Sequence, residues 1–357
     1  MNAEIKTGII FGGIIIAGII FLTILFIGLD ESASINQDSG IRKAPNLVGI
    51  AHYLNISSEE LTKKMDNKVI LYDIWTYSCI NCIRTLPFIT SWDEKYSDQG
   101  LLIIGIHSPE FEFEKDPQNV KIAIEKYGIT YPVVMDNNME TWKAFENNYW
   151  PRKYIADHEG NLRYDHIGEG SYQETEKVIQ QLLDERSIAM GIENISENKL
   201  VVIEEFEHTL FRTPELYFGY KFAQNRNQVG SDEGFQPERI VKYSEPNNIE
   251  LNKFYPIGNW KNHEDSMQLT ETIGSIKVSF DAKEVNIVTE NNAQLEIFLD
   301  GVALTKKHAG SDISFGNKMN VSNAGMYNII NSETSISHTM EIVIEGKGFQ
   351  AFTFTFG

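Results

Sequence analysis

The first apolar segment of the chain runs from Gly8 to Leu29 and contains no charged residue. At about 1.5 Å rise per residue its length matches the ~30 Å hydrocarbon core of a bilayer, so the pattern predicts one transmembrane helix. A secretory signal peptide is the alternative, because Ser32-Ala33-Ser34 offers a weak cleavage site, but the apolar region of such peptides is typically about 7 to 15 residues long. Whether the segment is cleaved stays open.

Charges on either side of this segment predict its orientation. Lys6 precedes it, Asp30 and Glu31 follow it, and no Lys or Arg appears before Arg42. Because positive charge favours the cytoplasmic side, the N-terminus is expected in the cytoplasm and the rest of the chain outside it. We therefore expect a single-pass membrane protein with an anchor at residues 1–29 and a flexible polar tether at residues 30–44.

Residues 45–197 alternate between apolar runs and helical patterns. Val69 to Trp75 and Leu101 to His107 are predicted to be buried strands. Helices are predicted at residues 83–96, 120–127 and 172–183. This alternation indicates an α/β domain in which helices cover a mixed sheet.

Strand-like alternation dominates residues 198–357. Apolar side chains occupy every second position around 276–280, 295–299, 340–344 and 352–356, with turn signals at Asp300-Gly301 and at Gly346-Lys347-Gly348. Several short strands without a long helix predict an all-β sandwich of the jelly-roll kind. The chain should thus contain two soluble domains behind one membrane anchor.

Composition narrows the possible functions. The 357 residues include 50 acidic and 31 basic side chains, a net charge of -19, which argues against a nucleic-acid partner because phosphate backbones are bound by excess Lys and Arg. The chain has only two cysteines, Cys79 and Cys82. This number excludes a dense disulfide framework and a zinc site made of three or four thiolates. No cofactor and no metal are expected.

The Cys79-Ile80-Asn81-Cys82 sequence lies between a predicted strand and a predicted helix. At a helix N-terminus, unpaired backbone N–H groups and the helix dipole favour the thiolate form of Cys79 and make it the attacking sulfur. One helical turn brings Cys82 within bonding distance, so that it can resolve a mixed disulfide with a substrate. The pair is therefore a candidate redox-active disulfide and the candidate catalytic centre.

Three other interpretations of the pair are less favoured. A c-type haem site needs His after the second cysteine, where this chain has Ile83. A zinc site needs two more ligands, and the eight His residues are scattered, with His158 and His166 too widely spaced for a typical ligand pair. A purely structural disulfide remains as the third alternative.

The surroundings of the pair resemble a known family. Asp73, Trp75, the two cysteines and Pro87 resemble the active-site strand and helix of the thioredoxin superfamily. More narrowly, residues 75–84 are similar to the extracytoplasmic part of DipZ-type cytochrome c biogenesis proteins, relatives of the TlpA and ResA group. Further segments fit this family at residues 107–111, 113–117, 149–154, 166–170, 213–220 and 352–357. The resemblance covers residues 45–357.

The resemblance implies roles for further residues. Asp73, in an otherwise apolar strand, would accept the proton of Cys82, with an exposed strand-end acid as the alternative. Pro151 would form a cis peptide bond beside the cysteines and align an extended substrate segment. Trp75 and Trp150 would flank the disulfide and offer apolar surface to the substrate, unless they simply pack in the core. Glu110 resembles a glutamate that tunes the cysteine pair in reducing relatives, with a solvated loop acid as the alternative.

The family implies a thiol-disulfide oxidoreductase that reduces disulfides in exported proteins, including apocytochrome c. DipZ-type proteins usually carry a multi-helix membrane domain of the CcdA kind, so a separate electron donor of that kind is expected as a partner. The second domain resembles carbohydrate-binding sandwiches, in which Tyr217, Tyr220, Tyr243, Tyr255 and Trp260 could stack on a glycan or pack in the core.

Two alternative functions stay open. Thr76-x-x-Cys79 is similar to the end of the peroxiredoxin pattern, which would indicate a peroxidase of the AhpC/TSA-redoxin type, although Tyr72 stands where that pattern has proline. The chain could also be a cell-surface glycan-binding module that the first domain only supports. The residues do not decide the direction of electron flow, because reduction potential also depends on packing.

Overall fold

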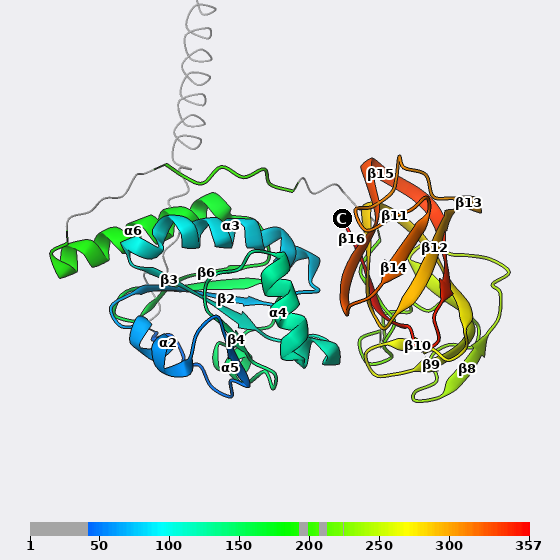
Figure 1. The fold of residues 1–357 in the computed structure, drawn as a ribbon, viewed down its shortest axis with the longest axis horizontal. Coiled ribbons are helices and arrows are strands. Elements are labelled where there is room, and N and C mark those ends of the chain that lie inside the picture. Colours follow the sequence, from blue (N-terminus) through cyan, green and yellow to red (C-terminus); the bar gives the residue numbers. More distant parts are fainter. Residues whose placement is uncertain (1–41, 193–198, 207–212, 224) are drawn as a thin grey trace, which may run out of the picture. The chain divides into compact units, whose positions relative to one another are not determined.

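A computed structural model describes residues 42–192, 199–206, 213–223 and 225–357 (Figure 1). The predicted membrane anchor lies outside the described residues. Within those ranges, no helix is both long enough and apolar enough to cross a membrane.

The first folded region is built on a six-stranded mixed sheet with the order β1-β4-β3-β2-β5-β6. Its strands are β1 (His52–Leu54), β2 (Val69–Trp75), β3 (Leu101–His107), β4 (Val133–Met135), β5 (Arg152–Ala156) and β6 (Leu162–Ile167). Strands β2, β3 and β4 are parallel, whereas β5 and β6 are antiparallel to their neighbours. Every residue of β2 and β3 is buried, as their continuous apolar sequences predict.

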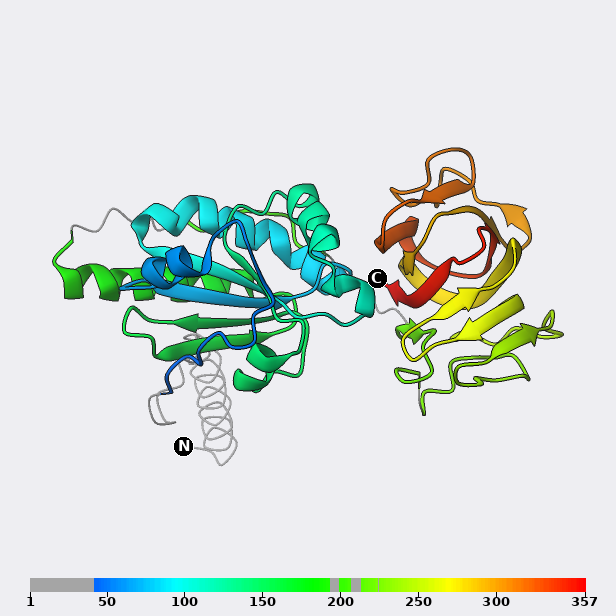
Figure 2. The ribbon, with the colours of Figure 1, turned by 60° about the horizontal axis from the view of Figure 1, so that its bottom comes forward.

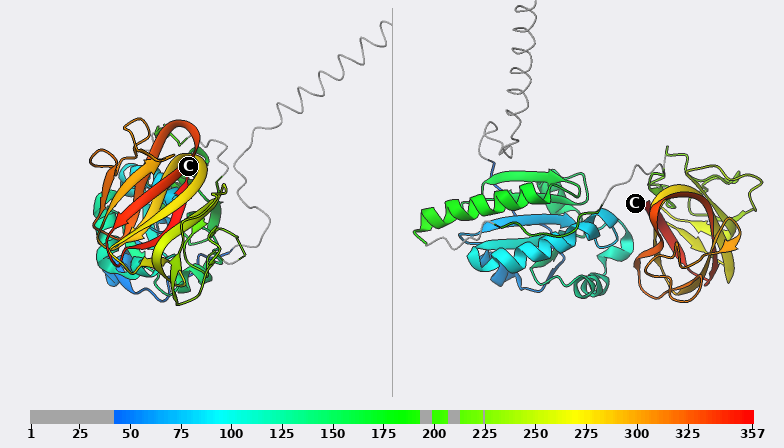
Figure 3. Two further views of the ribbon diagram at one scale, coloured as in Figure 1. Left: turned by 90° about the vertical axis from the view of Figure 1, so that its right-hand side faces the viewer. Right: turned by 90° about the horizontal axis from the view of Figure 1, so that it is seen from above.

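Helices cover both faces of this sheet. They are α2 (Ser58–Lys64), α3 (Ile80–Tyr96), α4 (Pro117–Lys126), α5 (Glu140–Ala144) and α6 (Tyr172–Met190), with short 3-10 turns η1 (Ser97–Gln99) and η2 (Glu112–Lys115). Helices α3 and α6 lie side by side on one face (Figure 3), where the rings of Phe88 and Tyr172 stack 3.6 Å apart. Leu61 of α2 and Trp142 of α5 belong to the apolar core on the other face. The predicted α/β domain is therefore confirmed.

The second folded region is all-β and antiparallel. Its strands are β7 (Leu216–Tyr217), β8 (Ile240–Tyr243), β9 (Lys253–Asn262), β10 (Met267–Leu269), β11 (Ile273–Glu290), β12 (Ala293–Leu299), β13 (Val302–Ala303), β14 (Lys318–Val321), β15 (Gly325–Glu345) and β16 (Gln350–Phe356). The order is β13-β12-β15-β11-β16-β10-β9-β8, with β14 beside β12 and β7 beside β16. The turns predicted at 300–301 and 346–348 connect β12 to β13 and β15 to β16.

Long strands shape this region. Strands β11 and β15 pair along most of their length, and their register shifts near Ala282–Glu284 and again at Val285–Asn286. Such irregularities bend a pair of strands, and Figure 2 shows the strands curving around a common interior. Buried apolar side chains from β7 to β16 fill that interior. The predicted β-rich domain is confirmed, whereas its finer assignment as a jelly-roll sandwich remains a prediction.

Candidate functional site

Cys79 lies where the sequence predicts it, immediately before the first residue of α3. It is the N-cap of that helix, and its Sγ accepts a hydrogen bond from the backbone N–H of Cys82 at 3.4 Å. Cys79 is partly exposed and Cys82 is buried, and both are free thiols. One sulfur can therefore be reached from solvent, and the other can be reached only from within the site.

A buried carboxylate holds the loop that leads to Cys79. Glu114 accepts hydrogen bonds from the hydroxyls of Thr76 (2.5 Å) and Ser78 (2.6 Å), and from the backbone N–H groups of Glu110 (2.6 Å) and Phe111 (3.0 Å). Burial raises the pKa of Glu114, and these donors oppose that shift. Glu114 was not predicted as a site residue, because an acid among aromatic residues gives no local sign that the fold will bury it.

Asp73 is buried in the middle of the sheet, which rules out the exposed strand-end alternative. It lies opposite Lys153 in the pairing of β2 with β5. Burial raises the pKa of Asp73 to about 6, with the charge of Lys153 opposing the shift. Burial also lowers the pKa of Lys153 to about 8, and this amine donates a 3.0 Å hydrogen bond to the carbonyl of Gly168. The carboxyl can therefore exchange a proton near neutral pH.

Cys82 interacts electrostatically with Asp73 and Lys153. Burial raises the pKa of the Cys82 thiol, and the neighbouring Cys79 and the charge of Asp73 raise it further. A buried thiol of this kind keeps its proton until a nearby base accepts it. Lys153 was not predicted as a site residue, and its position in the sheet is what brings it to Asp73.

The Trp150–Pro151 peptide bond is cis, as the resemblance implies. Pro151 is buried, whereas Trp150 is partly exposed. The Trp150 Nε1 donates a 2.9 Å hydrogen bond to the carbonyl of Ser108, and its ring lies 4.2 Å from that of Trp142. Trp150 thus keeps apolar surface that a substrate could contact.

The substrate-contacting role expected for Trp75 needs correction. Trp75 has no exposed surface, because it lies at the buried end of β2 with its ring edge-on to His107 at 5.4 Å. His107 is also buried between Trp75 and Tyr77, and burial lowers its pKa to about 3. These rings form a neutral aromatic layer beneath the loop that precedes Cys79.

Glu110 contacts the β-rich region. Its Oε1 accepts a 3.0 Å hydrogen bond from the hydroxyl of Tyr217, which also lies 2.8 Å from Oε2 of Glu215. Burial raises the pKa of Glu110, and the charges of Glu215, Glu114 and Cys79 raise it further. Glu110 is therefore not an isolated solvated acid, although its influence on the cysteines remains a prediction.

The proposed glycan-stacking residues do not form a surface. The aromatic residues named for that role are largely inside the β-rich region, since Tyr217, Tyr243, Tyr255 and Trp260 are buried. Only Tyr220 of this group is partly exposed. Aromatic stacking on a sugar needs an accessible ring face, and the four buried rings do not offer one.

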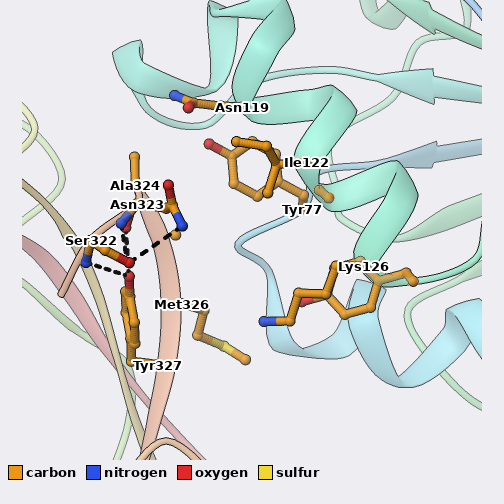
Figure 4. Close-up of a pocket in the computed structure, with 12 residues that line it drawn as sticks. Tyr77, Asn119, Ile122, Lys126, Ser322, Asn323, Ala324, Met326 and Tyr327 are labelled. Atoms are coloured by element: carbon orange, nitrogen blue, oxygen red, sulfur yellow. Dashed lines mark hydrogen bonds between the residues drawn. The ribbon is translucent and has the colours of Figure 1, made fainter. Parts of the chain in front are cut away.

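A cavity of about 170 Å³ borders the redox loop, which we define as residues 76–79 between β2 and α3 (Figure 4). Tyr77, which precedes Cys79 by two residues, lines it together with Ile122 and Lys126 of α4. The opposite wall comes from residues 322–327, where the hydroxyl of Tyr327 accepts hydrogen bonds from two backbone N–H groups and donates one to the carbonyl of Asn323. Both folded regions therefore contribute to the surroundings of the redox loop.

Comparisons with known proteins match both regions. Residues 42–183 match the Redoxin family, and residues 213–357 match the family described as a thioredoxin-like C-terminal domain. Protein DipZ of Mycobacterium tuberculosis is 33% identical over 317 residues, which cover 88% of this chain and 43% of DipZ. The chain therefore spans less than half the length of that relative.

Shorter relatives match the first region alone. The thiol-disulfide oxidoreductase YkuV of Bacillus subtilis is 32% identical over 143 residues, which cover 40% of this chain and 94% of YkuV. ResA of Bacillus cereus is 22% identical over 142 residues, or 40% of this chain and 77% of ResA. A solved thioredoxin-like protein in its oxidised form is 30% identical, covers 41% of this chain and 97% of its own, and has a TM-score of 0.37.

Proposed function

The chain belongs to the thioredoxin superfamily, among the DipZ- and ResA-like thiol-disulfide oxidoreductases, and from this premise we propose that it exchanges disulfides with protein substrates through Cys79 and Cys82. The observation that supports this proposal is the unequal exposure of the two thiols. Cys79 is partly exposed at a helix N-terminus, and Cys82 is buried within the electrostatic influence of Asp73. This arrangement suits an attacking sulfur and a resolving sulfur, respectively.

The first chemical step forms a mixed disulfide. The Cys79 thiolate attacks one sulfur of the substrate disulfide, so that a bond between Cys79 and the substrate forms while the substrate S–S bond breaks. The departing substrate sulfur leaves with the electron pair and takes up a proton. Trp150 and the cis Pro151 would hold the substrate segment during this step.

The second step releases the substrate. Cys82 gives its proton to Asp73 and attacks Cys79, which forms the Cys79–Cys82 disulfide and expels the second substrate sulfur as a thiolate. That thiolate then takes up the proton, and the substrate has gained the two electrons that the enzyme has lost. A carboxyl with a pKa of about 6 can both accept and return this proton near neutral pH.

Insulin reduction and mixed-disulfide trapping test the function. We expect Cys79→Ser to abolish insulin reduction and Cys82→Ser to accumulate a covalent adduct with substrate, because the attacking sulfur is still present but nothing resolves the bond. The double variant is the control for non-specific thiol capture. A wild type that reduces no insulin, together with a Cys82→Ser variant that traps nothing, would falsify the proposal.

We infer that the enzyme works as a reductant. Ile80 and Asn81 place no charge between the cysteines, so nothing there strongly stabilises an oxidising thiolate. The potential of the pair can be measured by equilibration with glutathione or thioredoxin. A value near -270 mV supports a reductant, whereas one near -120 mV would make the protein an oxidant.

We also propose that residues 8–29 anchor the enzyme in the membrane, with both folded regions outside the cytoplasm. Exported protein disulfides, including those of apocytochrome c, would be its substrates, and a separate membrane protein of the CcdA kind would supply electrons. Carbonate extraction and protease accessibility of whole cells test the location. Loss of the reduced Cys79–Cys82 form after deletion of the donor tests the electron route.

The peroxidase alternative can be separated from this proposal by kinetics. The hydroxyl of Thr76, which belongs to the part of the peroxiredoxin pattern present here, donates its hydrogen to Glu114. We expect hydrogen peroxide to oxidise Cys79 much more slowly than a protein disulfide does, as stopped-flow tryptophan fluorescence would show.

A further inference from the structure

The hydroxyl of Tyr217 lies between two carboxyl groups. It is 3.0 Å from Oε1 of Glu110 and 2.8 Å from Oε2 of Glu215. A tyrosine hydroxyl has one hydrogen and can donate to only one of them. If both carboxyl groups were ionised, one would face the oxygen lone pairs of Tyr217 at hydrogen-bond distance. Both contacts are satisfied together only when one carboxyl carries a proton and donates it.

The surroundings favour retention of that proton. Tyr217 is buried, and burial raises the pKa of both Glu110 and Glu215. Positive charge comes from Arg226, whose guanidinium lies 4.8 Å above the ring of Tyr217, and from Lys115 and Lys221, which line the same pocket as Glu110. Glu114 adds negative charge on the side of Glu110. Glu114 is buried and Glu110 and Glu215 are partly buried, so a second negative charge on the pair is costly.

Glu110 and Glu215 are also connected to the redox loop through Glu114. One oxygen of Glu114 accepts the hydroxyl of Ser78, and the other accepts the backbone N–H of Glu110. Cys79 directly follows Ser78, so this single carboxylate holds both the loop before Cys79 and the backbone of Glu110. The charge of Cys79 contributes to the raised pKa of Glu110, so a charge on Glu110 acts in turn on Cys79.

We propose that Glu110, Tyr217 and Glu215 hold one shared proton, and that Tyr217 and Glu215 of the β-rich region are thereby positioning residues that set the charge beside Cys79. Because one proton is shared, Glu110 and Glu215 together carry one negative charge instead of two. Part of that charge lies on Glu215 and not beside the Cys79 sulfur. A negative charge close to a thiol disfavours the thiolate. The β-rich region is then part of the redox site and has a role beyond the exchange reaction proposed for the cysteines.

Infrared spectroscopy tests the shared proton without reference to activity. At pH 8 Asp73 has lost its proton, and we expect the wild type to show a carboxylic-acid band from the shared proton. Either single variant, Glu110→Gln or Glu215→Gln, should remove this band. The one remaining carboxyl no longer meets a like charge, so it ionises and accepts the hydrogen bond of Tyr217 alone. The double variant should remove no more than either single variant. Glu112→Gln, an exposed neighbour in η2, is the matched control. A band that survives in either single variant overturns the proposal.

The pH profile of Cys79 alkylation tests the effect on the sulfur, in a Cys82→Ser background. In Glu215→Gln the charge is confined to Glu110, so the midpoint should rise by about 0.3 to 0.5 pH units. In Glu110→Gln the charge is confined to Glu215, and because the charge of Cys79 raises the pKa of Glu110 and not that of Glu215, the midpoint should fall by a similar amount. Shifts in the same direction, or none beyond that of Glu112→Gln, overturn the proposal. If insulin reduction is absent while these results hold, the proposed function fails and the shared proton does not.

Discussion

At the scale of single residues, the chemistry depends on one carboxyl inside the sheet. Asp73 faces Lys153 across β2 and β5, and burial outweighs the attraction of that amine, so the pKa of Asp73 rises to about 6. Burial likewise lowers the pKa of Lys153 to about 8. The two groups therefore change protonation on either side of neutral pH, within the range where thiol exchange is active.

Asp73→Asn should slow the resolving step and leave the attacking step unchanged. Asp73 accepts a proton only when ionised, so the wild-type rate of mixed-disulfide resolution should increase with pH through about 6 and the variant should lack that increase. Removal of a general base typically costs about 100-fold or more. Quenched-flow measurement of adduct release gives the resolving rate, and formation of the adduct is the internal control. Equal release rates in both proteins would remove the proton-acceptor role.

At the scale of elements, the turn between β2 and α3 is held from outside its own sequence. Its hydroxyls donate to Glu114, a residue that follows β3 and also accepts two backbone N–H groups from its own loop. A buried carboxylate with four donors fixes two loops relative to each other. The position of Cys79 therefore depends on η2 as much as on the helix that it caps.

Glu114→Gln should destabilise the protein by about 2 to 4 kcal/mol. The amide nitrogen is a donor, so at least one of the four donors would lose its acceptor in a buried place. Chemical denaturation should show a lower midpoint with the slope unchanged. Glu112→Gln, in the same turn but exposed, should change stability by less than about 0.5 kcal/mol. A midpoint equal to that of the control would mean that the loops are held by other contacts.

At the scale of the whole molecule, the two folded regions share buried contacts. Phe352 of β16 packs against Phe111 and Phe113, with ring centroids 5.1 and 4.7 Å apart. Arg84 of α3 pairs with Glu284 of β11 at 2.5 Å. The aromatic contacts lie at the loop that carries Glu110 and Glu114, so the β-rich region stabilises the same loop that supports the cysteines.

Phe352→Ala should lower the free energy of unfolding by about 3 kcal/mol, as expected for removal of a buried ring. The lost contacts support the loop that carries Glu114, and Glu114 holds Thr76 and Ser78 before Cys79, so mixed-disulfide formation should also slow. Phe315→Ala is the matched control, since the Phe315 side chain is 83% exposed. Calorimetry and adduct kinetics measure the two effects. A stable variant with unchanged kinetics would show that the aromatic contact does not support the loop.

Local patterns predicted the parts of the site that are close in sequence. The apolar runs located β2 and β3, and the cysteine spacing located the start of α3. The family resemblance, together with the position of an acid within an apolar strand, identified Asp73. Lys153 and Glu114 were missed as site residues, and Tyr217 was named only as a possible glycan-stacking residue, because strand pairing and long-range packing bring these side chains to the site and no sequence pattern records those contacts. Trp75 was assigned to the substrate for a related reason, since composition does not tell a buried tryptophan from an accessible one.

The hydrogen bond from the Cys82 amide to the Cys79 sulfur has a spectroscopic consequence. The acceptor, the Cys79 sulfur, changes its covalent partner in every turnover. The Cys82 amide therefore has a different acceptor in the thiolate, mixed-disulfide and disulfide forms. The nitrogen-15 resonance of Cys82 should therefore shift between these forms, whereas an amide in the middle of α3, such as that of Trp92, should not. A single labelled cysteine would then report the redox state of the enzyme in real time.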